Sequence, residues 1–293
     1  MTDRMTDRMT DHVTGPTSAQ RAERTTDAPL PGLERYYDAV PRVGGARAED
    51  FGPLTLFVQE GAGWPYYARP APGGPAPTAA DVERVRARQR ELGVPEAFEW
   101  VAGNSPGLLA AARAAGLHVH AHPLMVLDPT APPPPAHPGV RLLGADDPLL
   151  TQAVAVQALA FAEPGTAVGT AGTAELAAAA TEPSVLARSA RVAGMIRSGR
   201  TVLAGAVRDG TVLCAGQYNP VDGVAEVVAV GTLPSARRQG LALGVTAALA
   251  ADARARGART VFLSAGDEDV ARIYGRIGFH RVGTALIAEP PAC

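Results

Sequence analysis

The sequence predicts an α/β protein built in two halves, and three features support this prediction. Short apolar segments with strand character alternate with helical segments that end at glycine. Residues 128–139 read D-P-T-A-P-P-P-P-A-H-P-G, a stiff proline-rich stretch typical of a domain boundary. Residues 225–242 combine a strand, a proline-marked turn and the start of a helix rich in arginine and glycine.

The composition indicates a folded protein without a strongly charged face. The chain has 293 residues, 46% of them hydrophobic, which is enough for two domains with packed cores. The formal net charge is −2, so a broad nucleic-acid-binding surface is not expected. The two cysteines, Cys214 and Cys293, cannot form a disulfide framework or a thiolate zinc site. Since no apolar run has transmembrane or signal-peptide character, we expect a cytoplasmic protein without membrane association.

The first half is expected to follow a disordered tail. Residues 1–28 open with the repeat MTDR-MTDR-MTDH and hold too few apolar side chains to form a core. Residues 29–128 are predicted to form the N-terminal domain. Its expected strands are 54–58, 98–101 and 117–127, its expected helices are 81–92 and 106–115, and residues 61–77 are expected to form a loop.

A linker over residues 129–139 is predicted to lead into the second domain, residues 140–293. Ser184 is expected to cap a helix, and Asp209-Gly210 predicts a tight hairpin turn. The segment 164–182 is expected to be part loop and part weak helix. The expected strands are 140–143, 201–207, 211–218, 225–232, 261–264 and 282–288, and the expected helices are 147–161, 184–198, 241–256 and one that begins at Asp267 or Asp269 and ends before Gly278.

The junction between strand and helix near residue 237 has the features of an anion-binding site. A helix N-terminus exposes backbone N–H groups and the positive end of the helix dipole. Arg237 and Arg238 add positive charge, and Gly240 permits a close approach of the ligand to the backbone. We interpret this junction as a cradle for a cofactor phosphate, with an ordinary strand-to-helix turn as the alternative.

Two motifs in the second half point to a known family. Residues 237–242 read R-R-Q-G-L-A and fit the pattern R-x-x-G-x-G/A. Residues 271–279 read A-R-I-Y-G-R-I-G-F and fit A-x-x-Y-x-x-x-G-F. With the strand that precedes them, these motifs make residues 140–293 resemble the GNAT superfamily of N-acetyltransferases. The resemblance implies a GNAT fold with a mixed sheet, and residues 29–128 look like a degenerate second copy that lacks the phosphate cradle.

This resemblance also implies a reaction and a set of binding residues. Acetyl-CoA would donate an acetyl group directly to a primary amine of a small molecule or peptide, without a metal. Main-chain groups of Val230, Gly231 and Thr232 would pair with the pantetheine arm like an added strand. The pyrophosphate would contact the N–H groups of Arg237, Arg238, Gln239, Gly240, Leu241 and Ala242. A homodimer is compatible with the sequence.

Two side chains are candidates for the chemistry. Tyr274 holds the tyrosine position of the second motif, which in the family serves as the general acid for the departing thiolate. The alternative is a core tyrosine on the apolar stripe of its helix. Glu226 lies in an apolar strand where many family members carry a base, and burial would raise its pKa. The alternative is a solvated carboxylate at the start of the strand.

Other chemically active residues fit structural roles as well. His118, His120 and His122 alternate along one strand face, but next neighbours on such a face are about 7 Å apart and no cysteine or acid joins them, so no metal site is predicted. Cys214 is expected to be a small core residue. The aromatic residues Trp64, Tyr66 and Tyr67 would either line an acceptor pocket or pack between the halves.

A function without catalysis is also compatible with the sequence. The segment 164–182 is rich in alanine and glycine and offers few polar groups to orient an acceptor. The chain could therefore bind acetyl-CoA as a regulator rather than use it as a substrate.

Overall fold

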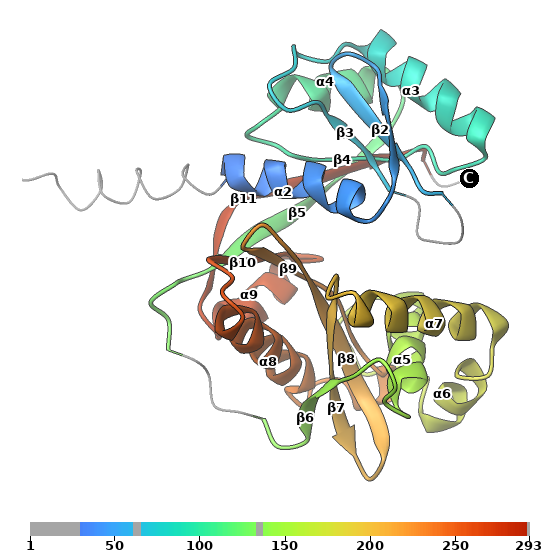
Figure 1. The fold of residues 1–293 in the computed structure, drawn as a ribbon, viewed down its shortest axis with the longest axis vertical. Coiled ribbons are helices and arrows are strands. Elements are labelled where there is room, and N and C mark those ends of the chain that lie inside the picture. Colours follow the sequence, from blue (N-terminus) through green and yellow to red (C-terminus); the bar gives the residue numbers. More distant parts are fainter. Residues whose placement is uncertain (1–29, 61–65, 133–136, 292–293) are drawn as a thin grey trace, which may run out of the picture.

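The described residues form a mixed α/β structure around a single sheet. The computed structural model describes residues 30–60, 66–132 and 137–291. Their strands form one eleven-stranded sheet in the order β1-β2-β3-β4-β11-β5-β10-β9-β8-β7-β6, which passes through both halves of the molecule (Figure 1). The pairs β3–β4 and β9–β10 are parallel and the other neighbours are antiparallel. The predicted mixed α/β fold is confirmed.

The N-terminal half forms one end of this sheet. Its elements are α2 (Leu30–Val43), β1 (Arg47–Asp50), β2 (Leu54–Val58), β3 (Ala68–Pro70), α3 (Ala79–Leu92), β4 (Phe98–Val101), α4 (Pro106–Ala114) and β5 (His118–Leu127). Helix α3 begins with a capping box in which Thr78 and Asp81 each accept the other's backbone N–H. Gly93, at a φ of 64°, ends this helix in the left-handed conformation that glycine adopts without strain.

The C-terminal half forms the other end. Its elements are β6 (Val140–Leu143), α5 (Leu150–Ala162), α6 (Thr173–Ala179), α7 (Pro183–Arg197), β7 (Val202–Arg208), β8 (Thr211–Val221), β9 (Val224–Thr232), η1 (Pro234–Ala236), α8 (Leu241–Ala255), β10 (Thr260–Ser264), α9 (Glu268–Gly275) and β11 (Phe279–Glu289). Among the helices of the described ranges, none is long and apolar enough to cross a membrane.

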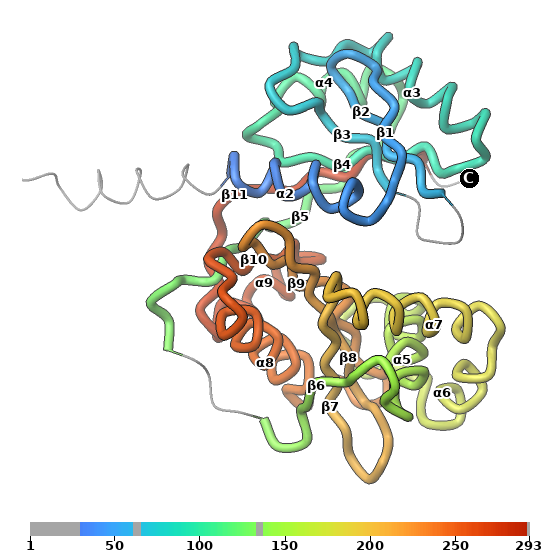
Figure 2. Tube along the Cα trace, in the orientation of Figure 1, coloured from blue at the N-terminus to red at the C-terminus, as the bar shows by residue number. Residues whose placement is uncertain are grey.

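Strand β11 joins the two halves. It lies between β4 and β5, both of which belong to the N-terminal half, and Figure 2 shows its red tube running beside them. Its register with β5 extends from Phe279 opposite Leu127 to Glu289 opposite His118. Leu286 consequently packs in the core of the N-terminal half. The strands before and after the predicted linker, residues 129–139, thus belong to one continuous sheet. The division into two domains stays a prediction.

Most predicted elements are present, with a few differences. The strands at 98–101 and 140–143 have the predicted bounds. The hairpin turn is confirmed, because Asp209 and Gly210 both have positive φ angles, 49° and 73°. The predicted cap at Ser184 is wrong, since the helix begins one residue earlier at Pro183 and Glu182 holds the cap position without a side-chain bond. Helix α2 and strands β1 and β3 were not predicted.

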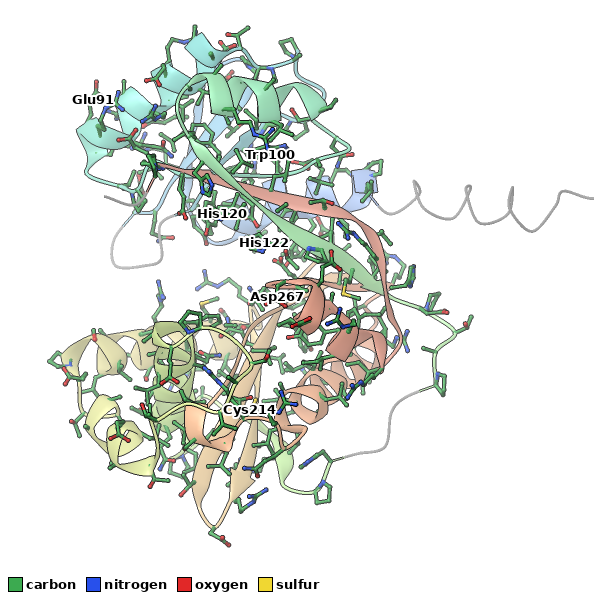
Figure 3. The ribbon with its side chains drawn as sticks, turned by 180° about the vertical axis from the view of Figure 1, so that it is seen from behind. Glu91, Trp100, His120, His122, Cys214 and Asp267 are labelled. Atoms are coloured by element: carbon green, nitrogen blue, oxygen red, sulfur yellow. The ribbon has the colours of Figure 1, made fainter. Side chains whose placement is uncertain are left out.

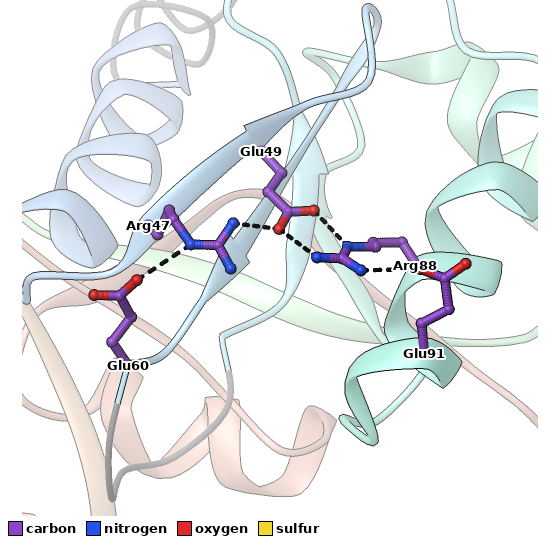
Figure 4. A network of polar contacts seen from close by, with 5 residues as sticks. All are labelled: Arg47, Glu49, Glu60, Arg88 and Glu91. Atoms are coloured by element: carbon purple, nitrogen blue, oxygen red, sulfur yellow. Dashed lines mark hydrogen bonds and ion pairs between the residues drawn. The ribbon is translucent and has the colours of Figure 1, made fainter.

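An ion-pair network covers the outer edge of the N-terminal half (Figure 4). Arg88 of α3 donates to both carboxylate oxygens of Glu49 on β1, at 2.9 Å and 3.1 Å, and also to Glu91 at 2.9 Å. Arg47 bridges Glu49 and Glu60. Because Arg88 and Glu49 come from different elements, the network fixes α3 against the edge strand, although exposed pairs contribute at most about 1 kcal/mol each.

Because β11 pairs with two strands of the N-terminal half, we expect that the C-terminal half cannot fold alone. A chain of residues 129–293 lacks both strand partners of β11 and the β5 partner of β10. Exposed strand edges of this kind promote aggregation. We expect this fragment to aggregate or to unfold without cooperativity in circular dichroism and size-exclusion chromatography.

The matched control is a chain of residues 29–293, which keeps every described strand. It is expected to unfold like the full chain. A monomeric, cooperatively unfolding 129–293 fragment would contradict the prediction and support an independent second domain.

Candidate functional site

The predicted site lies where strands β9 and β10 diverge. These parallel strands pair only at their starts, where Thr260, Val261 and Phe262 face Val224, Ala225 and Glu226. Further along, β10 pairs with β5 on its other side, and β9 continues beside β8. Residues 227–232 of β9, here called the open edge, therefore have no strand partner on the β10 side within the described chain.

A bulge shapes the open edge. Ala229 has a φ of 53°, and the register shifts between the pairs Ala215–Gly231 and Gln217–Val228. An inserted residue of this kind bends a strand and redirects its hydrogen-bonding groups. Gln157 of α5 donates to the carbonyl of Ala229 at 3.0 Å and so supports the bulge from one face.

Close packing explains the glycine that follows the bulge. A β-carbon on Gly231 would lie 2.8 Å from the β-carbon of Ala160 on α5. Val230 and Thr232 point to the opposite face, where Val230 lies against Gly216 and Thr232 donates to Cys214 at 3.3 Å. The three residues predicted to contact a pantetheine arm thus lie side by side on the open edge. Nothing in the sequence indicated the bulge.

The turn after β9 contains several backbone N–H groups that have no acceptor within the described chain. Arg238 and Gly240 have positive φ angles of 65° and 76°, and helix α8 begins directly afterwards at Leu241. Within the described chain, no backbone or side-chain acceptor contacts the N–H groups of residues 238–243. A non-glycine residue with positive φ is uncommon and often marks a functional turn. Arg238, Gln239 and Gly240 are exposed, which leaves these donors accessible to an anion.

Arg237 has a different role from its neighbour. Its side chain is buried and donates to the carbonyl oxygens of Ala160 at 3.3 Å and Ala167 at 3.1 Å, and also to that of Glu163. These contacts hold the end of α5 and the loop after it against the turn. The side chain of Arg237 is therefore a structural clamp, and its backbone N–H, which was predicted to contact the pyrophosphate, donates to the carbonyl oxygen of Pro234 at 3.4 Å instead. Arg238 keeps an exposed side chain beside the donors.

Glu226 lies next to the point where the strands diverge, in contact with the N-terminal half. The hydroxyl of Tyr37 on α2 donates to Glu226 Oε1 at 2.9 Å. Tyr36 donates to the backbone oxygen of Asn219, the residue paired with Glu226 across the sheet, at 2.8 Å. Desolvation and the charge of Glu99 raise the pKa of Glu226 to about 8, although Tyr37 and Arg69 oppose the rise. At this pKa the carboxyl group can both gain and lose a proton near pH 8.

A buried ion pair lies near this carboxylate. Arg69 of β3 is only 7% exposed, pairs with Glu99 of β4, and places its guanidinium 4.2 Å from the ring centroid of Tyr37. Burial also raises the pKa of Glu34 on α2, next to Arg69. Sequence reasoning missed Tyr37, Arg69 and Glu99. The apolar spacing of Leu30, Leu33 and Tyr37 could have predicted α2, but no local pattern links it to Glu226.

Tyr274 lies on the other face of the sheet. It is 8% exposed, its ring is 6.2 Å from that of Phe279, and it lies near Thr246 of α8 and Cys214 of β8. Burial and the neighbouring Cys214 thiol raise the pKa of Tyr274 to about 12. The Thr246 hydroxyl is buried and lacks a hydrogen-bond partner in the described chain. Glu226 thus lies at the start of the open edge, whereas Tyr274 lies on the opposite face near Cys214, which pairs with Thr232 at the end of that edge.

The remaining candidate residues have simpler environments. In the described chain, no group of three potential ligands could hold a metal ion. His118 and His120 contact each other at 3.3 Å, and His122 reaches the backbone oxygen of Gly266 at 3.1 Å. Figure 3 shows His120 and His122 on β5, with Cys214 in the other half. Cys214 is fully buried, as predicted, and Trp64 lies outside the described residues.

Two cavities lie away from this site. One of about 410 Å³ is bordered by Tyr218 and Arg256, and one of about 230 Å³ by Ala247 and Arg254. Neither is lined by Glu226, Tyr274 or the turn at residues 237–242.

One family model and several solved structures resemble this chain. A family model described as FR47-like protein matches residues 204–286, which span β7 to β11 and include the open edge, the turn and Tyr274. A search among curated proteins finds no match.

Solved structures share the fold over most of the chain. A GCN5-related N-acetyltransferase from Kribbella flavida is 24% identical with a TM-score of 0.64, and the match covers 90% of this chain and 96% of that one. A GNAT-family protein from Novosphingobium aromaticivorans is 21% identical with a TM-score of 0.51, covering 86% and 94%. A GCN5-related N-acetyltransferase-like protein from Streptococcus suis is 10% identical with a TM-score of 0.52, covering 93% and 99%. The predicted GNAT fold is confirmed.

The raised pKa of Glu226 predicts a pH-dependent stability. Between pH 4.5, its ordinary pKa, and about 8, the folded state holds a proton that the unfolded state releases. The free energy of unfolding should therefore fall as pH rises through this window, by about 1.4 kcal/mol per pKa unit of difference. Glu226→Gln, which cannot release a proton, is expected to reduce this decline in urea denaturation measured across the window, leaving the smaller part that the raised pKa of Glu34 contributes.

The control for this measurement is Glu91→Gln, at an exposed position on α3. It is expected to keep the wild-type slope. The assignment would be wrong if Glu226→Gln and Glu91→Gln gave the same dependence on pH.

Proposed function

We propose that this GNAT-fold chain is an N-acetyltransferase that moves acetyl from acetyl-CoA to a primary amine by direct attack. The fold and the FR47-like match support acyl transfer in general. The observation that carries the proposal is the divergence of β9 and β10, with a carboxyl group of raised pKa on one face and a buried tyrosine on the other. Such an arrangement suits a reaction that removes a proton on one side and releases a thiolate on the other.

The donor would bind along the open edge and at the turn. Val230, Gly231 and Thr232 lie on the open edge, and those of their backbone groups that point away from β8 would pair with an extended, amide-containing chain like an added strand. The N–H groups of residues 238–243 and the start of α8 fit the negative charge of a pyrophosphate. Leu241 and Ala242 contribute backbone only, while Arg238 adds a charged side chain. Cys214 is buried, and burial raises its pKa to about 12, which disfavours a covalent acetyl-enzyme.

Glu226 would act on the attacking amine. An amine with a pKa near ~10 is protonated at neutral pH and cannot attack a thioester until it loses a proton. The deprotonated fraction of Glu226, which grows as pH approaches its pKa of about 8, can accept that proton more readily than an ordinary carboxylate would. The Tyr37 hydroxyl keeps the carboxylate in place at 2.9 Å.

Tyr274 would act on the leaving sulfur. Its pKa of about 12 is well above the ~8.5 of an ordinary thiol, so complete proton transfer to the thiolate is uphill. A hydrogen bond from the Tyr274 hydroxyl can still stabilise the negative charge that develops on sulfur. The proposal therefore gives Tyr274 the role of a hydrogen-bond donor to the thiolate, with the proton of CoA supplied later by solvent.

Substitution of Tyr274 tests this chemistry. Tyr274→Phe removes a hydrogen bond to a developing charge, worth a factor of about 10 to 100 in rate. We expect kcat for amine-dependent CoA release to fall by this factor while KM for acetyl-CoA changes little. Tyr218→Phe is the matched control, because the Tyr218 hydroxyl donates to Asp252 at 2.7 Å, away from the site.

An unchanged rate in Tyr274→Phe would exclude this role. If the wild-type protein bound acetyl-CoA tightly and released no CoA with any of a broad panel of amines, the alternative function as an acetyl-CoA-binding regulator would be favoured.

A second test addresses the turn. Gln239 is exposed and accepts a hydrogen bond from Arg208 at 3.0 Å, so Gln239→Glu adds a negative charge without losing that contact. We expect acetyl-CoA affinity, measured by calorimetry, to fall about two- to fivefold at low salt and less at high salt. Gln239→Ala, which loses the Arg208 contact but adds no charge, should bind like wild type. Equal affinity for both variants would argue against a phosphate at this turn.

A further inference from the structure

Three arginines gather beside the proposed site without acidic partners. Arg188 and Arg191 lie one turn apart on α7, and Arg200 follows the end of that helix. We call them the arginine cluster. All three are partly buried, and none of them forms an ion pair with any described acidic residue. The side chains of Arg188 and Arg191 have no hydrogen-bonding or ionic partner among the described residues, whereas other partly buried arginines do, such as Arg88 with Glu49.

Contacts across the two halves fix the position of this cluster. Arg200 Nη1 donates to the carbonyl oxygen of Gly44, directly after α2, at 3.4 Å. The Tyr66 hydroxyl lies against the α-carbon of the same Gly44, where it fills the space that a β-carbon would take. Burial raises the pKa of Tyr66, and the charges of Arg200 and Arg191 oppose this rise, so both guanidinium groups lie near its hydroxyl.

The cluster leaves charge and hydrogen-bonding capacity unsatisfied. Arg191 Nε is buried and has no acceptor in the described chain. Arg188 and Arg191 repel each other, and burial together with this repulsion lowers the pKa of Arg188. Partly desolvated like charges are unfavourable unless an anion joins them, and planar guanidinium groups match carboxylate and phosphate oxygens.

Tyr66 and Tyr67 are adjacent in the chain and differ in the charges near their hydroxyl groups. For Tyr67, burial and the charges of Glu99 and Glu289 raise the pKa to about 12. Tyr37 of α2 donates to Glu226, and Gly44, directly after the end of α2, accepts a hydrogen bond from Arg200. The proposed base and the arginine cluster thus both contact α2 or the residue that follows it.

We infer that Arg188, Arg191 and Arg200 form an anion subsite for the acceptor, which is a primary amine carrying a carboxylate or phosphate. The amine lies at Glu226 and the anion at the arginine cluster. This inference rests on the proposed function for the identity of the reaction, but the anion subsite itself does not depend on catalysis.

The kinetic test compares matched acceptors that differ at one end. Hexylamine, 6-aminohexanoate and 5-aminopentyl phosphate are assayed for CoA release with the full chain. We expect kcat/KM to be at least about tenfold higher for an anionic acceptor than for hexylamine, since charge-assisted pairs to arginine are strong. The two anionic arms decide between carboxylate and phosphate. In Arg191→Met this preference is expected to fall at least about fivefold, and Arg191→Lys should restore part of it.

A binding test without acetyl-CoA separates the subsite from the chemistry. Inorganic phosphate and 6-aminohexanoate should raise the Tm of the wild-type protein, less so that of Arg191→Met, and equally that of Arg113→Met, an exposed control on α4. If these probes stabilise wild type selectively but no amine is acetylated, the proposed function fails and the anion subsite stands. If acetylation occurs without preference for anionic amines, and neither probe gives selective stabilisation, the inference is wrong.

Discussion

The pairing of β11 with β5 is the contact on which the rest of this structure depends. β5 comes from the N-terminal half and β11 from the end of the other, and they pair along the full length of β5. The same β5 also pairs with β10, so both cores are built on one strand. This continuity fixes α2, which belongs to the N-terminal half, at the face of β9 where Glu226 lies. The candidate site contains residues of both halves, so it forms only when α2 and β9 hold a fixed position relative to each other.

The tyrosines of α2 show how the two halves produce one site. Tyr36 and Tyr37 pack edge-on against Phe262, the residue opposite Glu226 on β10. Their rings remove water from the carboxyl group, while their hydroxyl groups supply hydrogen bonds that an apolar residue could not. Burial without the bond from Tyr37 would leave an unpaired carboxylate, and exposure would return it to its ordinary pKa. The proposed base thus depends on a helix far away in the sequence.

Local patterns predicted most elements, but not the tertiary surroundings of the candidate site residues. The strand, the turn and the Tyr274 helix follow from glycine, proline and apolar spacing, which act within a few residues. The bulge at Ala229 has no such signal, because alanine rarely adopts a positive φ and only tertiary contacts, such as the bond from Gln157, hold it there. Arg237 looked like a phosphate ligand, yet its side chain binds carbonyls of a loop about 70 residues away. Arg69 and Glu99 meet Glu226 only through tertiary contacts, which one sequence does not reveal.

The order of strands along the chain also sets an order of assembly. During synthesis β4 and β5 emerge early, but the strand that separates them, β11, is the last described strand to leave the ribosome. Until β11 is synthesised, β4 and β5 each have one strand edge without its hydrogen-bonding partner. These two edges could pair wrongly with each other. Translation speed and chaperone access should therefore matter more to this protein than to one whose halves close separately.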